Sequence, residues 1–253
     1  MAGRVAPALR ALLGNLVDYA GMFPPASLPV EAALSNYQRY RTGPHAWMAG
    51  RFVISAADLD TLRADMDLPF AVLSDSDHPR AAAIESKRII SASKPVYCEA
   101  SLDQIEEVKR VGSFAKIRTG GVTPQTIPSV EYVAEYISAC AELRMPFKAT
   151  AGLHHPIRSE HPLTYKPGGP SAMIHGFINV FVAAAFAWHG ERRIDAILAE
   201  TDPAAFKFDD RAHWRDRSLE AGEIRAARTE FAHSFGSCSF QEPIQDLQGH
   251  GWL

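Results

Sequence analysis

The sequence predicts a single α/β domain over residues 1–253, a (β/α)8 TIM-like barrel whose first and last units are irregular. Short apolar runs alternate with helical patterns along the chain, which is typical of parallel strands joined by crossover helices. About eight such runs can be counted, and 253 residues is close to the usual length of an eight-unit barrel. A doubly wound open sheet is the alternative, but no GxGxxG turn follows any of the runs.

Each predicted element is recognised by its apolar residues and by the turns and caps beside it. Ser101, for example, is a typical N-cap between one run and the helix that follows it. The predicted strands are 16–20, 46–55, 70–74, 95–100, 114–120, 147–152, 205–209 and 237–240. The predicted helices are 30–41, 58–66, 102–111, 130–143, 171–188 and 220–233.

Composition and charge narrow the class of function. Hydrophobic residues make up 47% of the chain, enough for a sizeable core. The net charge of −3 comes without a basic run, so neither nucleic acid nor an anionic membrane is an expected partner. The three cysteines show no CxxC spacing and the first 16 residues show no secretory pattern, which together favour the reducing cytoplasm. A small organic molecule is the expected partner.

One segment requires a check for membrane insertion. Residues 171–188 carry no full charge and lie at the lower edge of a membrane-spanning length. They include His175 and Asn179, however, and glycine and proline precede them. We therefore expect a buried or interface helix and no membrane span, and its apolar face makes a homodimer reasonable.

Polar residues alternate with apolar residues in three successive predicted strands. Because successive strand residues face opposite sides, the apolar set faces the helices and the polar set faces the barrel interior. Catalytic groups in such barrels lie at the C-terminal ends of the strands. The polar set therefore predicts one site, formed by Glu99, Lys116, Arg118, Lys148 and Thr150.

The two lysines suggest a carbonyl chemistry. A lysine buried beside other cations loses its proton more readily, because desolvation and like charge both disfavour the ammonium. Lys148 meets this condition if Lys116 and Arg118 lie one strand away, and a neutral lysine can form a Schiff base. Glu99 or Asp18 would then move the proton. The structural alternative is that Lys116 pairs with Glu99 and that Lys148 is solvated at its strand end.

Two resemblances bear on this hypothesis. The segment 148–152 (KATAG) resembles the Schiff-base strand of deoxyribose-phosphate aldolases, in which lysine is followed by small hydroxylated residues and glycine. This resemblance implies a class I aldolase chemistry on Lys148. It implies no sugar-phosphate substrate, because the next strand does not match the second lysine and glycine-rich loop of that family. The strings 18–25 and 235–240, with the lysine motifs, resemble an uncharacterised family of bacterial proteins of similar length.

Histidines offer a second chemistry. His154 and His155 follow the second lysine strand, and with His161, Glu160 and Asp209 they would supply ligands for zinc, iron or nickel. No HExxH or HxH spacing occurs, so no cofactor is expected and a divalent metal is the runner-up. Adjacent histidines on an extended backbone point in opposite directions, so only one is expected in the pocket, as a general acid/base or a substrate contact.

Glycines and a cysteine complete the candidates. The segment 154–170 shows no periodic pattern, and loops of this length are usually lids or binding loops. Gly168-Gly169 near its end and Gly120-Gly121 after the first lysine strand could each hold a phosphate or carboxylate on backbone N–H groups, or serve only as turns. Cys238 has no partner visible in the sequence and is expected to be a packed small side chain.

The sequence thus favours an enzyme, a lyase of the aldolase type that acts on a small anionic carbonyl compound. A metal-assisted lyase or hydrolase that uses His154 or His155 is the second hypothesis. A binding protein without catalysis, which holds an anionic metabolite on Lys116, Arg118 and Lys148, is the third.

Overall fold

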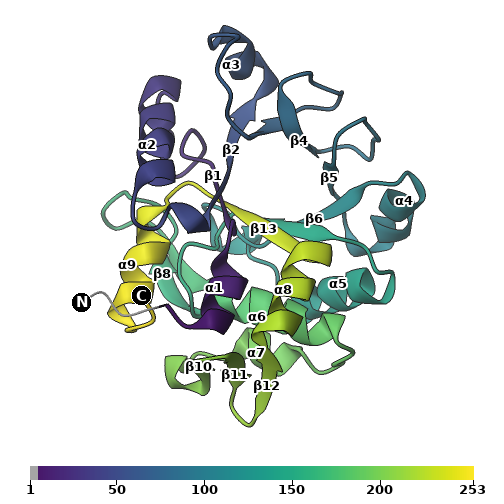
Figure 1. Cartoon of the computed structure of the whole chain (residues 1–253), viewed down its shortest axis with the longest axis vertical. Coiled ribbons are helices and arrows are strands. Elements are labelled where there is room, and N and C mark those ends of the chain that lie inside the picture. The colour runs from purple at the N-terminus through teal and green to yellow at the C-terminus, as the bar shows by residue number, and fades with distance from the viewer. Residues whose placement is uncertain (1–4) are drawn as a thin grey trace.

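Eight parallel strands close into a barrel in the computed structural model, which describes residues 5–253 (Figure 1). Around the barrel the order is β1-β13-β7-β6-β5-β4-β3-β2. The predicted (β/α)8 TIM-like barrel is therefore confirmed. Its strands are β1 (Val17–Tyr19), β2 (Ala49–Ser55), β3 (Phe70–Leu73), β4 (Ala81–Ser86), β5 (Val96–Glu99), β6 (Phe114–Arg118), β7 (Phe147–Thr150) and β13 (Ala232–Ser237).

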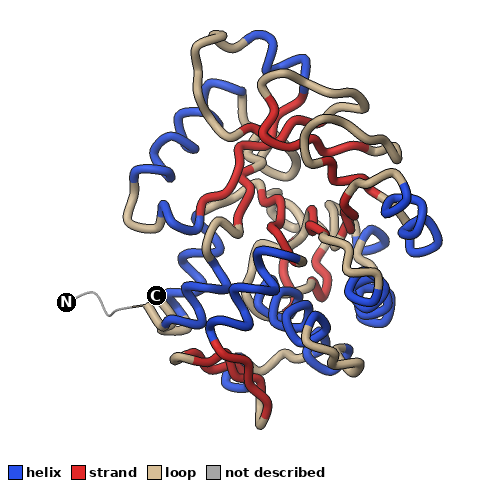
Figure 2. The backbone as a smooth tube through the Cα atoms, turned by 45° about the vertical axis from the view of Figure 1, so that its right-hand side comes forward, coloured by secondary structure: helices blue, strands red, loops and turns tan. Residues whose placement is uncertain are grey.

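Helices lie outside the ring of strands (Figure 2). Residues 74–80 and 87–95, on either side of β4, form no helix, so two units in the first half of the barrel lack a helix. The crossover from β7 to the last barrel strand is irregular too, because it contains five strands that lie outside the barrel. The helices are α1 (Pro7–Leu13), α2 (Val30–Thr42), α3 (Ala56–Thr61), α4 (Ile105–Arg110), α5 (Val130–Glu142), α6 (Phe177–Trp188), α7 (Asp195–Ala199), α8 (Ala221–Glu230) and α9 (Gln241–Gly249).

Two of the predicted barrel strands are wrong. The run 205–209 forms β10 (Phe206–Phe208), which pairs antiparallel with β11 (Arg211–Trp214) in a three-stranded sheet outside the barrel that ends in β12 (Arg217–Glu220). The last barrel strand is β13, which comes before the predicted 237–240, because α8 ends earlier than expected. The barrel strand missing from the prediction is β4, whose three alanines are weak strand formers and whose charged Glu85 ends its short apolar stretch.

The segment 154–170 is not a structureless loop. It contains β8 (Ser159–Pro162), which pairs antiparallel with β9 (Ser171–Ile174) to form a hairpin. The helix expected from residue 171 therefore begins only at Phe177. Within residues 5–253 no helix has the length and apolarity that crossing a bilayer requires.

The apolar helix α6 is buried within its own chain. Every residue from Phe177 to Ala187 is buried, and the helix contacts α5, α7, α8 and β13. Its apolar face is therefore covered by the rest of the chain, and the reason given above for a homodimer is removed.

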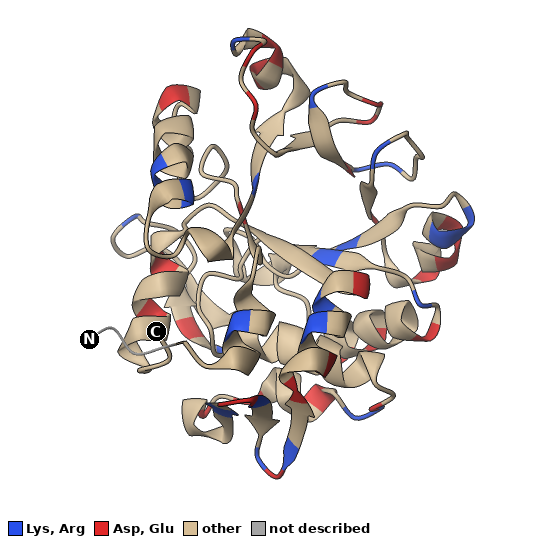
Figure 3. Ribbon diagram, in the orientation of Figure 1, with Lys and Arg blue, Asp and Glu red and all other residues tan. Residues whose placement is uncertain are grey.

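Charged residues occur on the barrel strands as well as on the outer helices (Figure 3). Four charged residues of the barrel strands are less than 5% exposed, namely Asp18, Glu85, Lys116 and Lys148. Charged groups are almost never fully buried unless they are paired, so the interior of this barrel requires a network of ion pairs.

Candidate active site

A cavity of about 570 Å³ opens at the C-terminal ends of the barrel strands, where barrel enzymes carry their active sites. Its size fits a small organic ligand. The aliphatic and proline side chains of its wall face two groups of polar residues, one on β4 to β7 and one on the segments after β7 and β13. The polar lining consists of Glu85, Lys87, Glu99, Lys116, Arg118, Thr126, Thr150, His154, His155, Thr164, Tyr165, Cys238 and Glu242.

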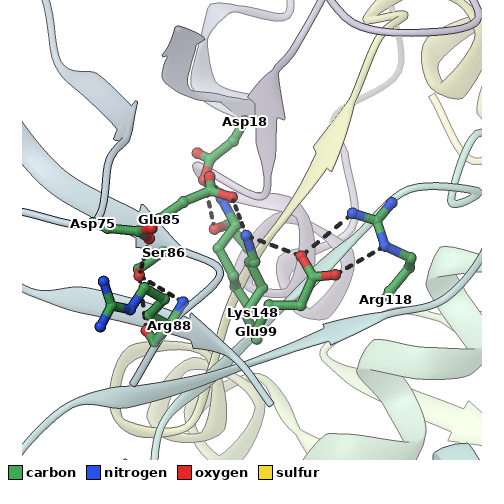
Figure 4. A network of polar contacts seen from close by, with 10 residues as sticks. Asp18, Asp75, Glu85, Ser86, Arg88, Glu99, Arg118 and Lys148 are labelled. Atoms are coloured by element: carbon green, nitrogen blue, oxygen red, sulfur yellow. Dashed lines mark hydrogen bonds and ion pairs between the residues drawn. The ribbon is translucent and has the colours of Figure 1, made fainter. Parts of the chain in front are cut away.

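Lys148 does not line this cavity but is fully buried in the barrel interior, where it lies beside Glu85 and Asp18 (Figure 4). Its Nζ is 2.6 Å from Asp18 Oδ2 and 2.5 Å from Glu85 Oε1. Asp18 also accepts hydrogen bonds from the Ser234 hydroxyl at 2.8 Å and from the Arg51 backbone N–H at 2.7 Å. The sequence prediction that Lys148 faces the interior is correct, and the alternative of a solvated strand-end lysine is wrong.

The carboxylates keep Lys148 charged. Burial alone would lower its pKa, but Asp18 and Glu85 outweigh burial and raise the pKa above its usual range. Burial would likewise raise the pKa of Asp18 and of Glu85, yet the ammonium of Lys148 holds both below their usual values. The expectation of a lowered Lys148 pKa is therefore wrong, because Glu85 stands on the strand that the sequence did not predict. A Schiff base requires the neutral amine, so Lys148 is poorly placed as a nucleophile.

The floor of the cavity is a second set of ion pairs. Lys116 Nζ lies 3.4 Å from Glu85 Oε2 and 3.3 Å from Glu99 Oε2, so Glu85 joins the two lysines. Arg118 donates to Glu99 from Nε at 3.1 Å and from Nη2 at 3.3 Å. Burial would raise the pKa of Glu99, but Arg118 and Lys116 lower it. The predicted convergence of Lys116, Arg118 and Glu99 is correct, and so is the pairing of Lys116 with Glu99.

A cysteine, a histidine and a carboxylate form a chain in the lining of the same cavity, on the segments after β7 and β13. Cys238 follows β13, and its Sγ lies 3.8 Å from His154 Nε2. The other ring nitrogen of His154, Nδ1, lies 2.7 Å from Glu242 Oε2, on the first turn of α9. Tyr165, from the loop of the β8–β9 hairpin, places its hydroxyl 3.9 Å from the same Sγ. Cys238 is buried, as expected of a packed small side chain, but it also lines the cavity and has a partner that the sequence did not show.

The environment of His154 favours its protonated form. Burial would lower the pKa of the imidazole, but its hydrogen bonds to Cys238 and Glu242 outweigh burial and raise the pKa to about 9. The contact with His154 also lowers the pKa of Glu242, against the effect of burial. At neutral pH the imidazole therefore carries a proton beside the sulfur, as in enzymes that activate a cysteine with a histidine.

His155 also faces the cavity, which contradicts the expectation that only one of the two histidines would do so. Its Nδ1 lies 2.5 Å from Asp246 Oδ2, one helical turn after Glu242. The ring of His161 stacks on it, with centroids 3.4 Å apart and planes inclined by 5°. The alternation of side chains expected for an extended strand does not hold at the two histidines, because the segment bends after β7. Ala151 and Gly152 have left-handed backbone there.

The residues proposed as metal ligands do not all meet at one place, although the three histidines lie close together. Asp209 pairs with His213 beside the small three-stranded sheet, and Glu160 is exposed on the hairpin. Over residues 5–253, no group of three or more His, Cys, Asp or Glu side chains has an arrangement that could hold a metal ion. The histidines that do reach the cavity hold carboxylates of α9.

The two glycine pairs have different places. Gly120 and Gly121 line the cavity, as does Thr150. Gly168 and Gly169 do not, because they form the turn of the β8–β9 hairpin and the helix they were expected to precede starts later. A cradle for an anion thus remains only at the first pair.

Gly152 should not tolerate a side chain. Its φ is +78°, and a Cβ there would lie 2.9 Å from the Gly120 Cα. We expect Gly152→Ala to lower the free energy of unfolding by more than about 1 kcal/mol, measured by urea denaturation. Gly222→Ala is the control, since Gly222 lies in α8 with open space around it, and it should raise stability by up to about 1 kcal/mol. Equal changes in the two variants would contradict this account.

Comparison with known proteins found no relative of this chain. No family model, no curated protein and no solved structure matches the chain. Barrels of this type support many unrelated chemistries, so the fold by itself does not select a reaction. The function has to follow from the side chains that meet in the cavity.

Proposed function

We propose that the protein is a thiol-dependent enzyme that transfers or hydrolyses an acyl group of a small molecule, with Cys238 as nucleophile. The observation that carries this proposal is the chain Cys238–His154–Glu242 within one cavity, with separations of 3.8 and 2.7 Å. A nucleophile, a base within reach of it and a group that orients the base are the requirements of covalent acyl transfer. The three residues come from two segments that the barrel brings together, one after β7 and one that runs from the end of β13 into α9.

Each residue has a defined step in the reaction. Sγ of Cys238 attacks the carbonyl carbon while its proton is held on His154 Nε2, and the carbonyl π electrons move to oxygen. The tetrahedral intermediate collapses to a thioester as the leaving group takes the proton from His154. Water then adds to the thioester, His154 removes a proton from it, and the acid leaves as the C–S bond breaks and the thiol is restored. Glu242 accepts the Nδ1–H bond and so keeps Nε2 directed at the sulfur.

Tyr165 would donate a hydrogen bond to the substrate carbonyl oxygen, which becomes negatively charged in these steps. Its hydroxyl lies 3.9 Å from Sγ, longer than a direct O–H···O bond, and this leaves room for a carbonyl oxygen attached to the carbon under attack. Donors directed at that oxygen are among the largest contributors to acyl transfer. The hairpin that carries Tyr165 also covers the sulfur, whose residue is only 6% exposed.

The test is the reactivity of Cys238 relative to the other two cysteines. Cys98 and Cys140 are fully buried and do not line the cavity, so they serve as internal controls. We expect iodoacetamide to alkylate Cys238 first, and p-nitrophenyl acetate to give a stoichiometric burst with an acetyl group on Cys238 by mass spectrometry. His154→Gln should slow both reactions by about a hundredfold or more, and Cys238→Ala should abolish the burst. An acetyl group elsewhere, or no burst, would refute the proposal.

A lyase that acts on a small anionic carbonyl compound is the second candidate. Lys116 lines the cavity and lies 3.3 Å from Glu99, which could exchange a proton with an amine. Lys116, and not Lys148, would then form the Schiff base. Borohydride in the presence of keto acids should trap an adduct on Lys116 if this candidate is correct. Absence of an adduct, together with an acyl-Cys238, would leave only the thiol mechanism.

A further inference from the structure

Arg118 offers one free edge to the cavity. Glu99 occupies the edge formed by Nε and Nη2, with bonds of 3.1 and 3.3 Å. The structure gives Nη1 no partner among residues 5–253, and the side chain is 46% exposed. The carboxylate of Glu99 thus fixes the plane of the guanidinium and leaves the Nη1–Nη2 edge free. A guanidinium held in this way binds a second carboxylate with two parallel hydrogen bonds.

The other charges of this wall also favour an anion. Glu85 and Glu99 are already paired with Lys116, Lys148 and Arg118. Lys87 lines the cavity too, and has no acidic partner within 4.0 Å in the part of the chain that the structure describes. The groups left to meet a ligand at this side are therefore cationic.

The register of the sheet sets the distance from Arg118 to the thiol. Arg118 is the Cα partner of Thr150 on β7, and Thr150 is the Cα partner of Gly236 on β13. These three residues form one row across three strands, about 10 Å wide at the usual strand spacing of about 4.8 Å. Cys238 lies two residues beyond Gly236. Thr150 and Gly236 line the cavity between the two ends, and Gly236 has no side chain to obstruct it.

From this arrangement we infer that the substrate is an acyl derivative of a dicarboxylic acid, with its free carboxylate on Arg118 and its reactive carbonyl at Cys238. The carbon chain between them crosses Thr150 and Gly236. This inference rests on the proposed role of Cys238 and adds the class of substrate to it. The derivative is an ester, a thioester or an amide, since each yields the same thioester with the enzyme.

The test compares two esters of equal length. Mono-p-nitrophenyl glutarate carries the free carboxylate, and methyl p-nitrophenyl glutarate has it capped. We expect the wild-type protein to react with the charged ester about ten to a hundred times faster in kcat/KM, as a charge-assisted pair would give. Arg118→Met should remove this preference, so that the kcat/KM values for the two esters become about equal. Arg192→Met, at an exposed arginine away from the cavity, should behave like the wild type.

Arg118→Met should fold, because Glu99 keeps its ion pair with Lys116. A second readout does not depend on turnover: glutarate should slow the alkylation of Cys238 by iodoacetamide in the wild type and not in Arg118→Met. If neither ester acylates Cys238, the proposed function itself has failed. If both acylate it and the preference is absent, or persists in Arg118→Met, the carboxylate site is wrong and the thiol mechanism stands.

Discussion

Lys148→Met should lower the free energy of unfolding by about 3–5 kcal/mol, the cost of removing one partner from a buried ion pair. The substitution keeps a long unbranched side chain but leaves Asp18 and Glu85 without the cation they share at 2.6 and 2.5 Å. Both carboxylates are largely shielded from water, since Asp18 is 0% and Glu85 4% exposed. Urea denaturation at pH 7 measures the loss. Lys166→Met, at an exposed lysine, is the matched control and should change stability little.

A rescue experiment separates lost charge pairing from lost packing. In the Lys148→Met background, Asp18→Asn removes the unpaired charge and should restore part of the stability. Glu85→Gln should restore less, because Glu85 keeps its ion pair with Lys116 at 3.4 Å. A loss below about 1 kcal/mol in Lys148→Met alone would contradict the account, because that is the range of exposed ion pairs.

The stability conferred by His154 should depend on pH with a defined sign. Its pKa rises from 6.5 to about 9 on folding, because the bonds to Cys238 and Glu242 outweigh burial. The protonated form is therefore bound more tightly in the folded state, so the contribution is complete below pH 6.5 and is lost as pH rises through 9. At about 1.4 kcal/mol per pH unit, the shift corresponds to about 3 kcal/mol.

The measurement is the difference in free energy of unfolding between the wild type and His154→Gln from pH 6 to pH 10. This difference should shrink by about 3 kcal/mol over that interval. His250→Gln, at an exposed histidine, should give a much smaller change. A difference that is flat, or that grows with pH, would show that His154 is not held as an imidazolium.

The fold could be predicted from the sequence where strands alternate between apolar and polar residues. That pattern located β5, β6 and β7 and correctly directed Lys116 and Arg118 to the interior. It failed at β4, where three alanines and the interior Glu85 leave only a short apolar stretch in place of the run that usually indicates a buried strand. It failed again at 205–209, because a short apolar run does not show whether its partners are parallel or antiparallel.

The site was predicted only in part, for a related reason. Charge effects on Lys148 were judged from its neighbours on β6, while the dominant partners stand on β1 and β4. His154, the partner of Cys238, is 84 residues away along the chain, so no local sequence motif links the two residues. The signal that could have joined them is a cysteine in the predicted strand 237–240 and a histidine shortly after the predicted strand 147–152, since the ends of barrel strands meet at one face.

The helix α9 couples the two histidine–carboxylate pairs to each other. Glu242 and Asp246 lie one turn apart on it, and they hold His154 and His155 respectively. A shift or fraying of this helix weakens both contacts at once. A movement of the segment after β7, which carries the two histidines, cannot adjust one pair independently of the other. Substitutions at the four positions should therefore be strongly non-additive, because they act on a single cooperative unit and not on two independent bases.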